Sequence, residues 1–353
     1  MKLEEVVKSI KPTDKSVFVK ANERLRNQAK PAGSLGVLET VSARLASIAG
    51  KLDVHLKHKK VLVCAGDHGV VAQGVSLFPQ EVTHQMVLNF VNGGASINVL
   101  ARHANADVHV IDMGVNFDFA DDLNIFHKKI AKGTADISEG AAMSRSEAIK
   151  SIENGISVVE ELCAKGSVDI IATGDMGIGN TTASTAIIGV LSGMDLAKLA
   201  GRGTGIDDEA LKNKIKVLQR AIQINRPDKS DAIDVLAKVG GFEIGGLAGI
   251  VIGAAAAGLP VVCDGLISTA GALIACEIAP IAKEYLFASH KSVEIAHQFM
   301  HSHLGLEPLF DFGLRLGEGT GATLALEILD ASTRVLADIK TFAEIGIGDC
   351  NLD

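Results

Sequence analysis

One carboxylate, Glu318, stands between two glycines in the segment GLRLGEGTGAT, residues 313–323. A glutamate that only adds solubility does not need glycine on both sides. Glycine is costly in ordering entropy and is kept where the backbone turns sharply or approaches another group closely. The segment therefore indicates a functional carboxylate on a tight loop, and its chemistry depends on the residues that converge there.

Two other glycine-rich segments could hold a phosphate. GDMGIGNTTAS, residues 174–184, follows a predicted strand and leads into a helix, so free N–H groups and the positive end of the helix dipole would face an anion. It lacks the GK[ST] ending of a P-loop, which argues against nucleoside triphosphate cleavage through that motif. GRGTGIDDEAL, residues 201–211, begins a helix on which Lys214 follows, and lysine as a point charge suits a phosphomonoester.

The opening segment also fits the dinucleotide fingerprint G-x-G-x-x-A through Gly317, Gly319 and Ala322. The match is weak, because the fingerprint belongs at the start of a βαβ unit and this copy lies near the C-terminus. A nicotinamide-dependent oxidoreductase is therefore one alternative function. A non-catalytic nucleotide-binding protein is another, and it would keep the glycine loops without needing Glu318.

Five further polar residues have a spacing that could hold a metal ion or form an orienting pair. His297 and His301 lie four apart in HQFMHSH, a spacing that can hold a metal ion, with His303 close behind. No HExxH pattern or third ligand is identifiable, so we interpret them as surface or capping residues and predict no metal site. Asp67 and His68 in AGDHGV are either an orienting pair or a strand-end turn, and both interpretations stay open.

Short apolar runs alternate with helical patterns along the chain. The runs are typical of strands buried on both faces of a parallel sheet, with the helices as crossovers. We predict a doubly wound α/β domain whose ligand crevice lies beyond the carboxyl ends of the strands, near Asp67, Asp175 and Asp264. The predicted strands are 59–66, 106–114, 168–174 and 259–265, and the predicted helices are 81–103, 145–164, 181–193, 208–223, 244–257, 266–279 and 319–332.

The 353 residues fit one large domain with a smaller appendage. We expect residues 51–332 to form a large Rossmann-like catalytic domain, and residues 1–50 and 333–353 to form a small helical domain from both termini. Aromatic residues make up 4%, which predicts an aliphatic core. Five widely spaced cysteines predict neither a disulfide framework nor a structural zinc site.

Charge and hydropathy narrow the partners. The net charge of −8 and the lack of a long basic run predict no nucleic-acid partner. The charged first residues lack the apolar stretch of a signal peptide, and the apolar runs near 244–257 and 266–279 are studded with glycine. We expect a soluble cytoplasmic protein that does not bind a membrane.

Taken together, the motifs resemble one family. KPAGSLGVLE (30–39), AGDHGV (65–70), FPQEVTHQMVLNFVNGGASINVLAR (78–102), GDMGIGNTTAS, GRGTGIDD, VVCDGLIS and GEGTGA occur in the order and spacing of the nicotinate-nucleotide:dimethylbenzimidazole phosphoribosyltransferases. The resemblance covers residues 24–332. It implies a homodimer with a parallel-sheet domain and a small helical domain, whose active site borrows from the neighbouring subunit.

The resemblance also implies a reaction. The 5-phosphoribosyl group of nicotinate mononucleotide would pass to 5,6-dimethylbenzimidazole with inversion at C1′, giving α-ribazole 5′-phosphate and nicotinate in cobalamin biosynthesis. No cofactor or metal ion would be needed. Some members of the family use adenine or phenolic compounds, so the acceptor base stays open.

The resemblance assigns site residues by motif. Glu318 would be the general base, with glycines that let the loop approach a flat ring, and Asp175 a second catalytic acid. Asp175 departs from the family pattern, in which the longer glutamate is more frequent. The phosphate and ribose would contact Gly177, Ile178, Gly179, Asn180, Thr181, Gly203, Lys214, Asp264 and Ser292. The benzimidazole would contact Ser76, Leu77, Phe78, Gln85, Met176 and Leu316.

Overall fold

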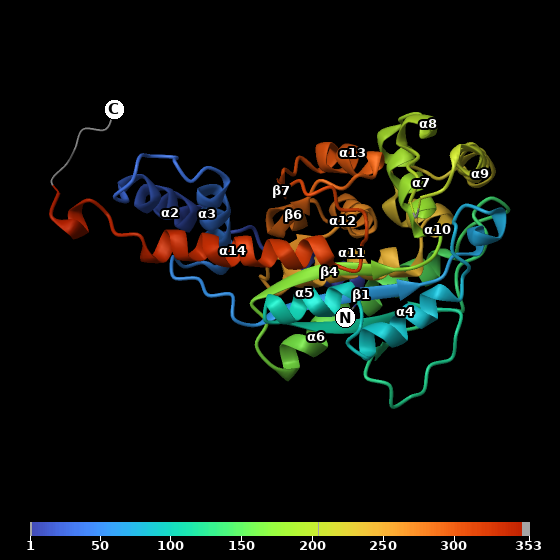
Figure 1. Cartoon of the computed structure of the whole chain (residues 1–353), viewed down its shortest axis with the longest axis horizontal. Helices are drawn as coiled ribbons and strands as arrows, with labels where there is room; N and C mark the ends of the chain where they lie inside the picture. The colour runs from blue at the N-terminus through green and yellow to red at the C-terminus, as the bar shows by residue number, and fades with distance from the viewer. Residues whose placement is uncertain (1, 204, 348–353) are drawn as a thin grey trace.

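A computed structural model of the chain describes residues 2–203 and 205–347 (Figure 1). Seven parallel strands form one sheet in the order β3-β2-β1-β4-β5-β6-β7, which confirms the predicted α/β class. The strands are β1 Lys59–Gly66, β2 Ala106–Gly114, β3 Phe126–His127, β4 Ile170–Met176, β5 Val261–Cys263, β6 Leu286–His290 and β7 Pro308–Phe310. The strand order reverses between β1 and β4, and such a reversal opens a crevice at the carboxyl ends of the strands.

Helices cover both faces of the sheet. They are α1 Leu3–Ser9, α2 Lys15–Asn27, α3 Val37–Ala49, α4 Val82–Val91, α5 Ser96–His103, α6 Arg145–Lys165, α7 Asn180–Ser192, α8 Leu196–Leu199, α9 Asp208–Asn225, α10 Ala232–Val239, α11 Phe242–Ala256, α12 Leu266–Ile278, α13 Ile295–Leu304 and α14 Thr320–Asp338, with 3-10 turns η1 Gly69–Gln73, η2 Pro280–Tyr285 and η3 Ala343–Ile345. Side chains alternate along β1. Leu62 and Cys64 join the core under α6, α11 and α12, whereas Val61 and Val63 join the core under α5 and α14.

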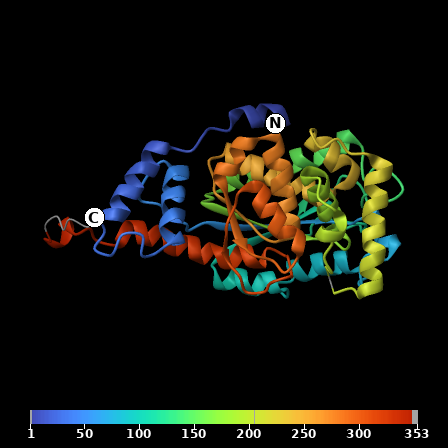
Figure 2. The same ribbon diagram turned by 90° about the horizontal axis from the view of Figure 1, so that it is seen from above.

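The long helix α14 leaves the sheet and packs beside α2 and α3 (Figures 1 and 2). Its last carbonyls are satisfied by α2 and the residue after it, because Arg24 Nε donates to Leu336 at 2.9 Å and Gln28 Nε2 donates to Val335 at 2.6 Å. Helix α1 instead lies against α11 and α6. The division into residues 51–332 and a domain from the two termini stays a prediction.

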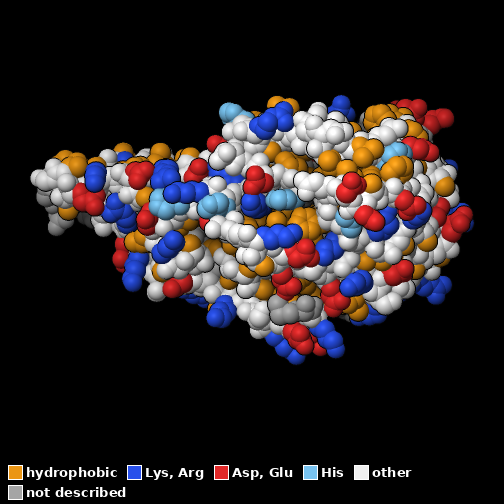
Figure 3. Space-filling model, turned by 90° about the horizontal axis from the view of Figure 1, so that it is seen from below, with side chains coloured by type: hydrophobic (Ala, Val, Ile, Leu, Met, Phe, Trp, Pro, Cys, Tyr) orange, Lys and Arg blue, Asp and Glu red, His pale blue; other side chains and the backbone are white. Residues whose placement is uncertain are grey.

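Some predicted elements differ from those observed. The predicted helix over 81–103 is two helices, because Gly93, with φ of 75°, lies in a turn between α4 and α5. Strands β3, β6 and β7 were not predicted. Among the described residues, no helix combines the length and apolar character needed to span a membrane. Positive and negative side chains intermix over the face in Figure 3, where α2, α3 and the end of α14 form the narrow lobe.

Candidate active site

A pocket of about 510 Å³ opens at the carboxyl end of β4, a volume that suits a small-molecule ligand. Its walls are the loop from β4 into α7, the first turn of α12, the residues after β6, and the loop before α14. This is the crevice that the strand order predicts. The predicted site residues that line it are Asp175, Met176, Gly177, Ile178, Asn180, Thr181, Gly203, Ser292, Leu316 and Glu318.

Glu318 lies directly before α14 and is 6% exposed. Its φ of 62° is left-handed, and its neighbours Gly317 and Gly319 have φ of 87° and 91°. The Glu318 Oε2 atom accepts a hydrogen bond from the N–H of Ile97 at the start of α5, at 3.1 Å. Burial raises the pKa of Glu318, and this hydrogen bond opposes the rise. A carboxylate in this environment is a reasonable proton acceptor.

The glycines around Glu318 allow two backbones to touch. A Cβ atom on Gly174, in β4, would lie 2.5 Å from the carbonyl oxygen of Glu318. A Cβ atom on Gly317 would lie 3.3 Å from both carboxylate oxygens of Asp175. The expectation that these glycines admit a flat ring is therefore incomplete, because they first let the loop pack on the end of β4.

Asp175 is buried beside this loop. Its Oδ2 atom accepts a hydrogen bond from Asn180 Nδ2 at 3.0 Å, and its Oδ1 atom has no hydrogen-bond partner in the described parts of the chain. Burial, followed by the nearby carboxylates of Asp264 and Glu243, raises the pKa of Asp175 well above its usual range. These surroundings favour the protonated form.

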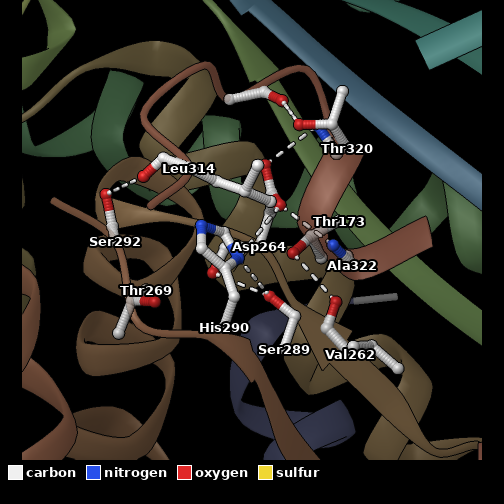
Figure 4. A network of polar contacts seen from close by, with 12 residues as sticks. Thr173, Val262, Asp264, Thr269, Ser289, His290, Ser292, Leu314, Thr320 and Ala322 are labelled. Atoms are coloured by element: carbon white, nitrogen blue, oxygen red, sulfur yellow. Dashed lines mark hydrogen bonds and ion pairs between the residues drawn. The ribbon is translucent and has the colours of Figure 1, made fainter. Parts of the chain in front are cut away.

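Asp264 differs from its predicted role as a ligand contact, because it does not line the pocket. Its fully buried carboxylate accepts hydrogen bonds from the N–H groups of Gly319 at 3.0 Å and Ala322 at 2.9 Å (Figure 4). Burial raises the pKa of Asp264 to about 7, although these hydrogen bonds oppose the rise. Asp264 thus caps α14 and fixes the loop that carries Glu318. The same bonds occupy the N–H groups that a dinucleotide pyrophosphate would need, which removes the structural basis for the oxidoreductase alternative.

A cation and a helix N-terminus meet at Thr181. Helix α7 follows Gly179, whose φ is 95°, and the N–H groups of Asn180 and Thr182 at its start donate to the carbonyl groups of Gly177 and Gly179 at 3.2 Å and 3.0 Å. Lys214 of α9 is fully buried and donates from Nζ to Thr181 Oγ1 at 2.8 Å. Burial lowers the pKa of Lys214 to about 8, with Glu294 opposing the change. Gly203 adjoins both groups, since its Cβ atom would lie 3.1 Å from Thr181 Oγ1 and 3.6 Å from Lys214 Nζ. Such a site suits a phosphate.

Comparison with known proteins agrees with this geometry. A family model described as "Phosphoribosyltransferase" matches residues 10–347. A relative from Geobacter sp. (strain M21), named nicotinate-nucleotide–dimethylbenzimidazole phosphoribosyltransferase, is 51% identical over 345 residues, which cover 98% of this chain and 99% of the relative. The chain belongs to this family. A relative of the same name from Syntrophobacter fumaroxidans (strain DSM 10017 / MPOB) is 50% identical over 348 residues, 99% of each chain.

The fold is shared with a solved member of the family. The crystal structure of the nicotinate-nucleotide–dimethylbenzimidazole phosphoribosyltransferase from Thermus thermophilus matches with a TM-score of 0.90 and 42% identity. The match covers 96% of this chain and 100% of that one. The family membership and the enzyme class that the motifs predicted are both confirmed.

The residues that the family resemblance assigned to the base divide into two groups. Met176 and Leu316 line the pocket, whereas Gln85 and the segment Ser76, Leu77 and Phe78 do not. Leu77 and Phe78 are 60% and 50% exposed. Contact of this segment with the base stays a prediction.

Ten pocket residues were not among the predicted site residues: Met86, Gly265, Leu266, Ile267, His290, Glu294, Gly313, Leu314, Arg315 and Gly317. His290 ends β6, a strand that the sequence analysis missed. Arg315 lies three residues before Glu318, within the same loop, and that position was an available signal. Met86 lies next to Gln85 on α4 and is thus one residue from a predicted site.

The interpretation of His297 and His301 as surface residues is wrong, since both are buried. His297 makes a contact of the capping type, because its Nδ1 atom accepts from the N–H of Ser292 just before α13. No cluster of three or more His, Cys, Asp or Glu side chains within residues 2–203 and 205–347 could hold a metal ion. His68 pairs with Glu243 at 2.6 Å, so its partner is not the adjacent Asp67.

Proposed function

We propose that the protein transfers the 5-phosphoribosyl group of nicotinate mononucleotide to 5,6-dimethylbenzimidazole or a related base. The observation that carries this proposal is one pocket lined both by Glu318 and by the start of α7, behind which Lys214 lies buried. The start of α7 and Lys214 would bind the phosphate, and Glu318 would serve the acceptor base. The names of the relatives support these substrates.

The chemistry requires one proton acceptor. A benzimidazole nitrogen attacks C1′, and the bond from C1′ to the pyridinium nitrogen breaks with its electron pair, so nicotinate leaves with a neutral ring. The leaving group is already cationic and needs no acid. The attacking ring carries an N–H group that becomes acidic as the new bond forms, and Glu318 takes that proton. Attack opposite the β-linked pyridine inverts C1′ and gives α-ribazole 5′-phosphate for cobalamin biosynthesis.

The other acids would support Glu318. Asp175 has an unpartnered Oδ1 atom and surroundings that favour its protonated form, so it would donate a hydrogen bond to the ribose or to a water molecule. Asp264 would hold the Glu318 loop from behind. Orientation of the two rings in line with C1′ would supply much of the remaining acceleration.

A cytoplasmic homodimer with a shared active site is part of this proposal. The exposure of Leu77 and Phe78 supports a role for their segment at an interface with the base or with a second subunit. Sedimentation of the purified protein would test the dimer. A monomer that is fully active at nanomolar concentration would contradict it.

The central experiment is a base panel. The protein is mixed with nicotinate mononucleotide and one of dimethylbenzimidazole, benzimidazole, adenine or p-cresol, and nicotinate release and the product anomer are measured. Release that depends on a benzimidazole and yields the α anomer is the expected result. If the mononucleotide binds but no base causes release, the protein is a non-catalytic nucleotide-binding member of the family. Preference for adenine or p-cresol would reassign the acceptor.

A further inference from the structure

Three buried histidines are in contact, His290 at the end of β6 and His297 and His301 on α13. The ring centroids of His290 and His297 are 5.9 Å apart, and those of His297 and His301 are 4.0 Å apart. His290 lines the pocket, whereas His297 is fully buried and His301 is 5% exposed. None of these three histidines has a role in the proposed reaction as described above.

The hydrogen bonds of His297 fix its tautomer. The main-chain N–H of Ser292 lies 3.2 Å from Nδ1, and an N–H group can only donate, so Nδ1 is the unprotonated nitrogen. A neutral imidazole then carries its proton on Nε2, which lies 2.9 Å from Thr269 Oγ1 and donates to it. Burial, followed by the two neighbouring histidines, lowers the pKa of His297 well below its ordinary value, so the ring stays neutral.

These two hydrogen bonds join two walls of the pocket. Thr269 belongs to α12, whose first residues, Leu266 and Ile267, line the pocket. Ser292 lines it from the segment after β6. The Ser292 hydroxyl group donates in turn to the carbonyl of Leu314 at 3.3 Å, in the loop that carries Glu318 (Figure 4). A continuous set of contacts therefore runs from the His297 ring to the catalytic loop.

We propose that His297 is a positioning residue of the active site, which holds Ser292 and the 313–318 loop in place through its Nδ1 atom. It does not touch substrate. The inference rests on the proposed function and on the predicted contact of Ser292 with the phosphate or ribose of nicotinate mononucleotide. Loss of the Nδ1 contact therefore raises the KM for the mononucleotide more than the KM for the base, because Ser292 is bonded directly to Nδ1 whereas the 313–318 loop is reached only through Ser292.

Two variants separate the ring nitrogens. His297→Asn keeps an oxygen acceptor near the place of Nδ1, and His297→Gln places its amide near the place of Nε2. We expect His297→Gln to raise the KM for nicotinate mononucleotide by about 2-fold to 10-fold, the size of one lost hydrogen bond. His297→Asn is expected to restore most of that loss. The KM for dimethylbenzimidazole should change less than the KM for the mononucleotide in both.

His301→Asn is the matched control. It also removes a buried ring from this group of three histidines, but the Nε2 atom of His301 has no hydrogen-bond partner in the described ranges. A wild-type KM for the mononucleotide is expected. If His301→Asn raised this KM as much as His297→Gln, or if His297→Gln kept a normal KM, the positioning role would be wrong. Better rescue by Gln than by Asn would assign the effect to Thr269 instead.

Nitrogen NMR of wild-type His297 gives a reading that needs no variant. Nδ1 should show the shift of an unprotonated nitrogen and Nε2 that of a protonated one, unchanged from pH 5 to pH 8. The opposite tautomer, or titration in that range, would overturn the proposal even if every variant failed to fold. Failure of the proposed function is distinguishable, because wild-type protein would then release no nicotinate while the tautomer remained measurable.

Discussion

Glu318 combines a strained backbone with an anchored carboxylate. A left-handed conformation in a residue other than glycine costs on the order of 1–3 kcal/mol and persists only where the surrounding structure enforces it. The Asp264 carboxylate enforces it from behind through the N–H group of Gly319, and the Ile97 N–H group holds Oε2. In the proposed reaction, Oε1 would then be the oxygen that accepts the proton from the base.

Glu318→Gln tests this residue as the base. The variant keeps the size of the side chain but removes the proton acceptor, so turnover should fall by about 10²–10⁴ while both substrates still bind. Single-turnover rates and equilibrium binding of each substrate measure the two effects separately. Glu23→Gln, an exposed change on α2, is the control and should be nearly silent.

The product anomer distinguishes a base from a nucleophile. Direct transfer inverts C1′ and gives the α product, whereas a nucleophilic Glu318 would form a ribosyl-enzyme and retain the configuration. Retention would reject the base assignment. So would near-normal turnover by the glutamine variant.

The lowered pKa of Lys214 predicts that the binding of nicotinate mononucleotide depends on pH. The pKa of Lys214 in the free protein is about 8, and a bound phosphate favours the protonated form. The affinity for nicotinate mononucleotide should therefore be high at pH values below 8 and should fall progressively as the pH rises above 8. Lys214→Ala should weaken mononucleotide binding by about 1.5–3 kcal/mol and remove this dependence. Titration calorimetry from pH 6.5 to pH 9.5 measures both, with exposed Lys216→Ala of the same helix as control.

The stability of the fold depends on the protonation of Lys214 in the opposite direction to mononucleotide binding. The folded-state pKa of about 8 lies below the ordinary value of 10.5, so the unfolded chain holds more protons than the folded chain between these values. The contribution of Lys214 to the free energy of unfolding therefore increases, and the folded state becomes more stable, as the pH rises through this window. Equal loss of binding for both substrates in Lys214→Ala would show that the lysine supports the fold rather than the phosphate.

Much of the site could be predicted from local sequence, and the rest depends on distant contacts. The glycine loops identified Glu318, Asp175 and Thr181, because their spacing reports backbone approach and helix starts. Nothing local indicates that Asp264 caps a helix 55 residues later. Likewise, His297 resembles a surface histidine until α12 is placed beside it.

At the scale of elements, β4 and the loop before α14 meet backbone to backbone. Gly174→Ala should disrupt this contact, because the new Cβ atom would lie 2.5 Å from the Glu318 carbonyl oxygen. We expect a loss of about 1–3 kcal/mol in the free energy of unfolding and a larger fractional fall in kcat than in affinity. Gly140→Ala is the control, since its Cβ atom would meet nothing within 4 Å. Normal kcat in Gly174→Ala would show that the loop position does not set the rate.

The same scale explains which strands the sequence predicted. Strands β1, β2, β4 and β5 are near-continuous apolar runs, since neighbours cover both faces and both edges. The outermost strands β3 and β7 have only two and three residues, and β7 begins with Pro308, which edge strands tolerate. Neither segment belongs to a longer apolar run of the kind that contains β5, LPVVC at residues 259–263, so they are not distinguished from loops. The helix predicted over 81–103 missed its break because the apolar pattern continues across the turn.

Over the whole molecule, α14 runs from the pocket to the helices α2 and α3. Its first turn is held by Asp264 beside the pocket, and its last carbonyls are held by Arg24 and Gln28 beside α2 and α3. Because each end has its own anchor, we expect that loosening one end does not by itself move the other. Helix α14 therefore connects α2 and α3 to the sheet, while Asp264 holds the loop that carries Glu318 independently of that connection.

Arg24→Ala tests this separation. Removing the guanidinium group takes one donor from the carbonyl of Leu336, which keeps a contact with Gln28 Nε2 at 3.4 Å, and one from the carbonyl of Ala337, so the free energy of unfolding should fall by about 1–3 kcal/mol. The kcat of the folded fraction should stay within about 2-fold of wild type, because Asp264 still holds the first turn of α14. Urea unfolding and steady-state rates measure the two quantities, with exposed Arg26→Ala as control. A large fall in kcat with little loss of stability would mean that the terminal helices position Glu318 through α14, and the two anchors would then have to be treated as one coupled unit.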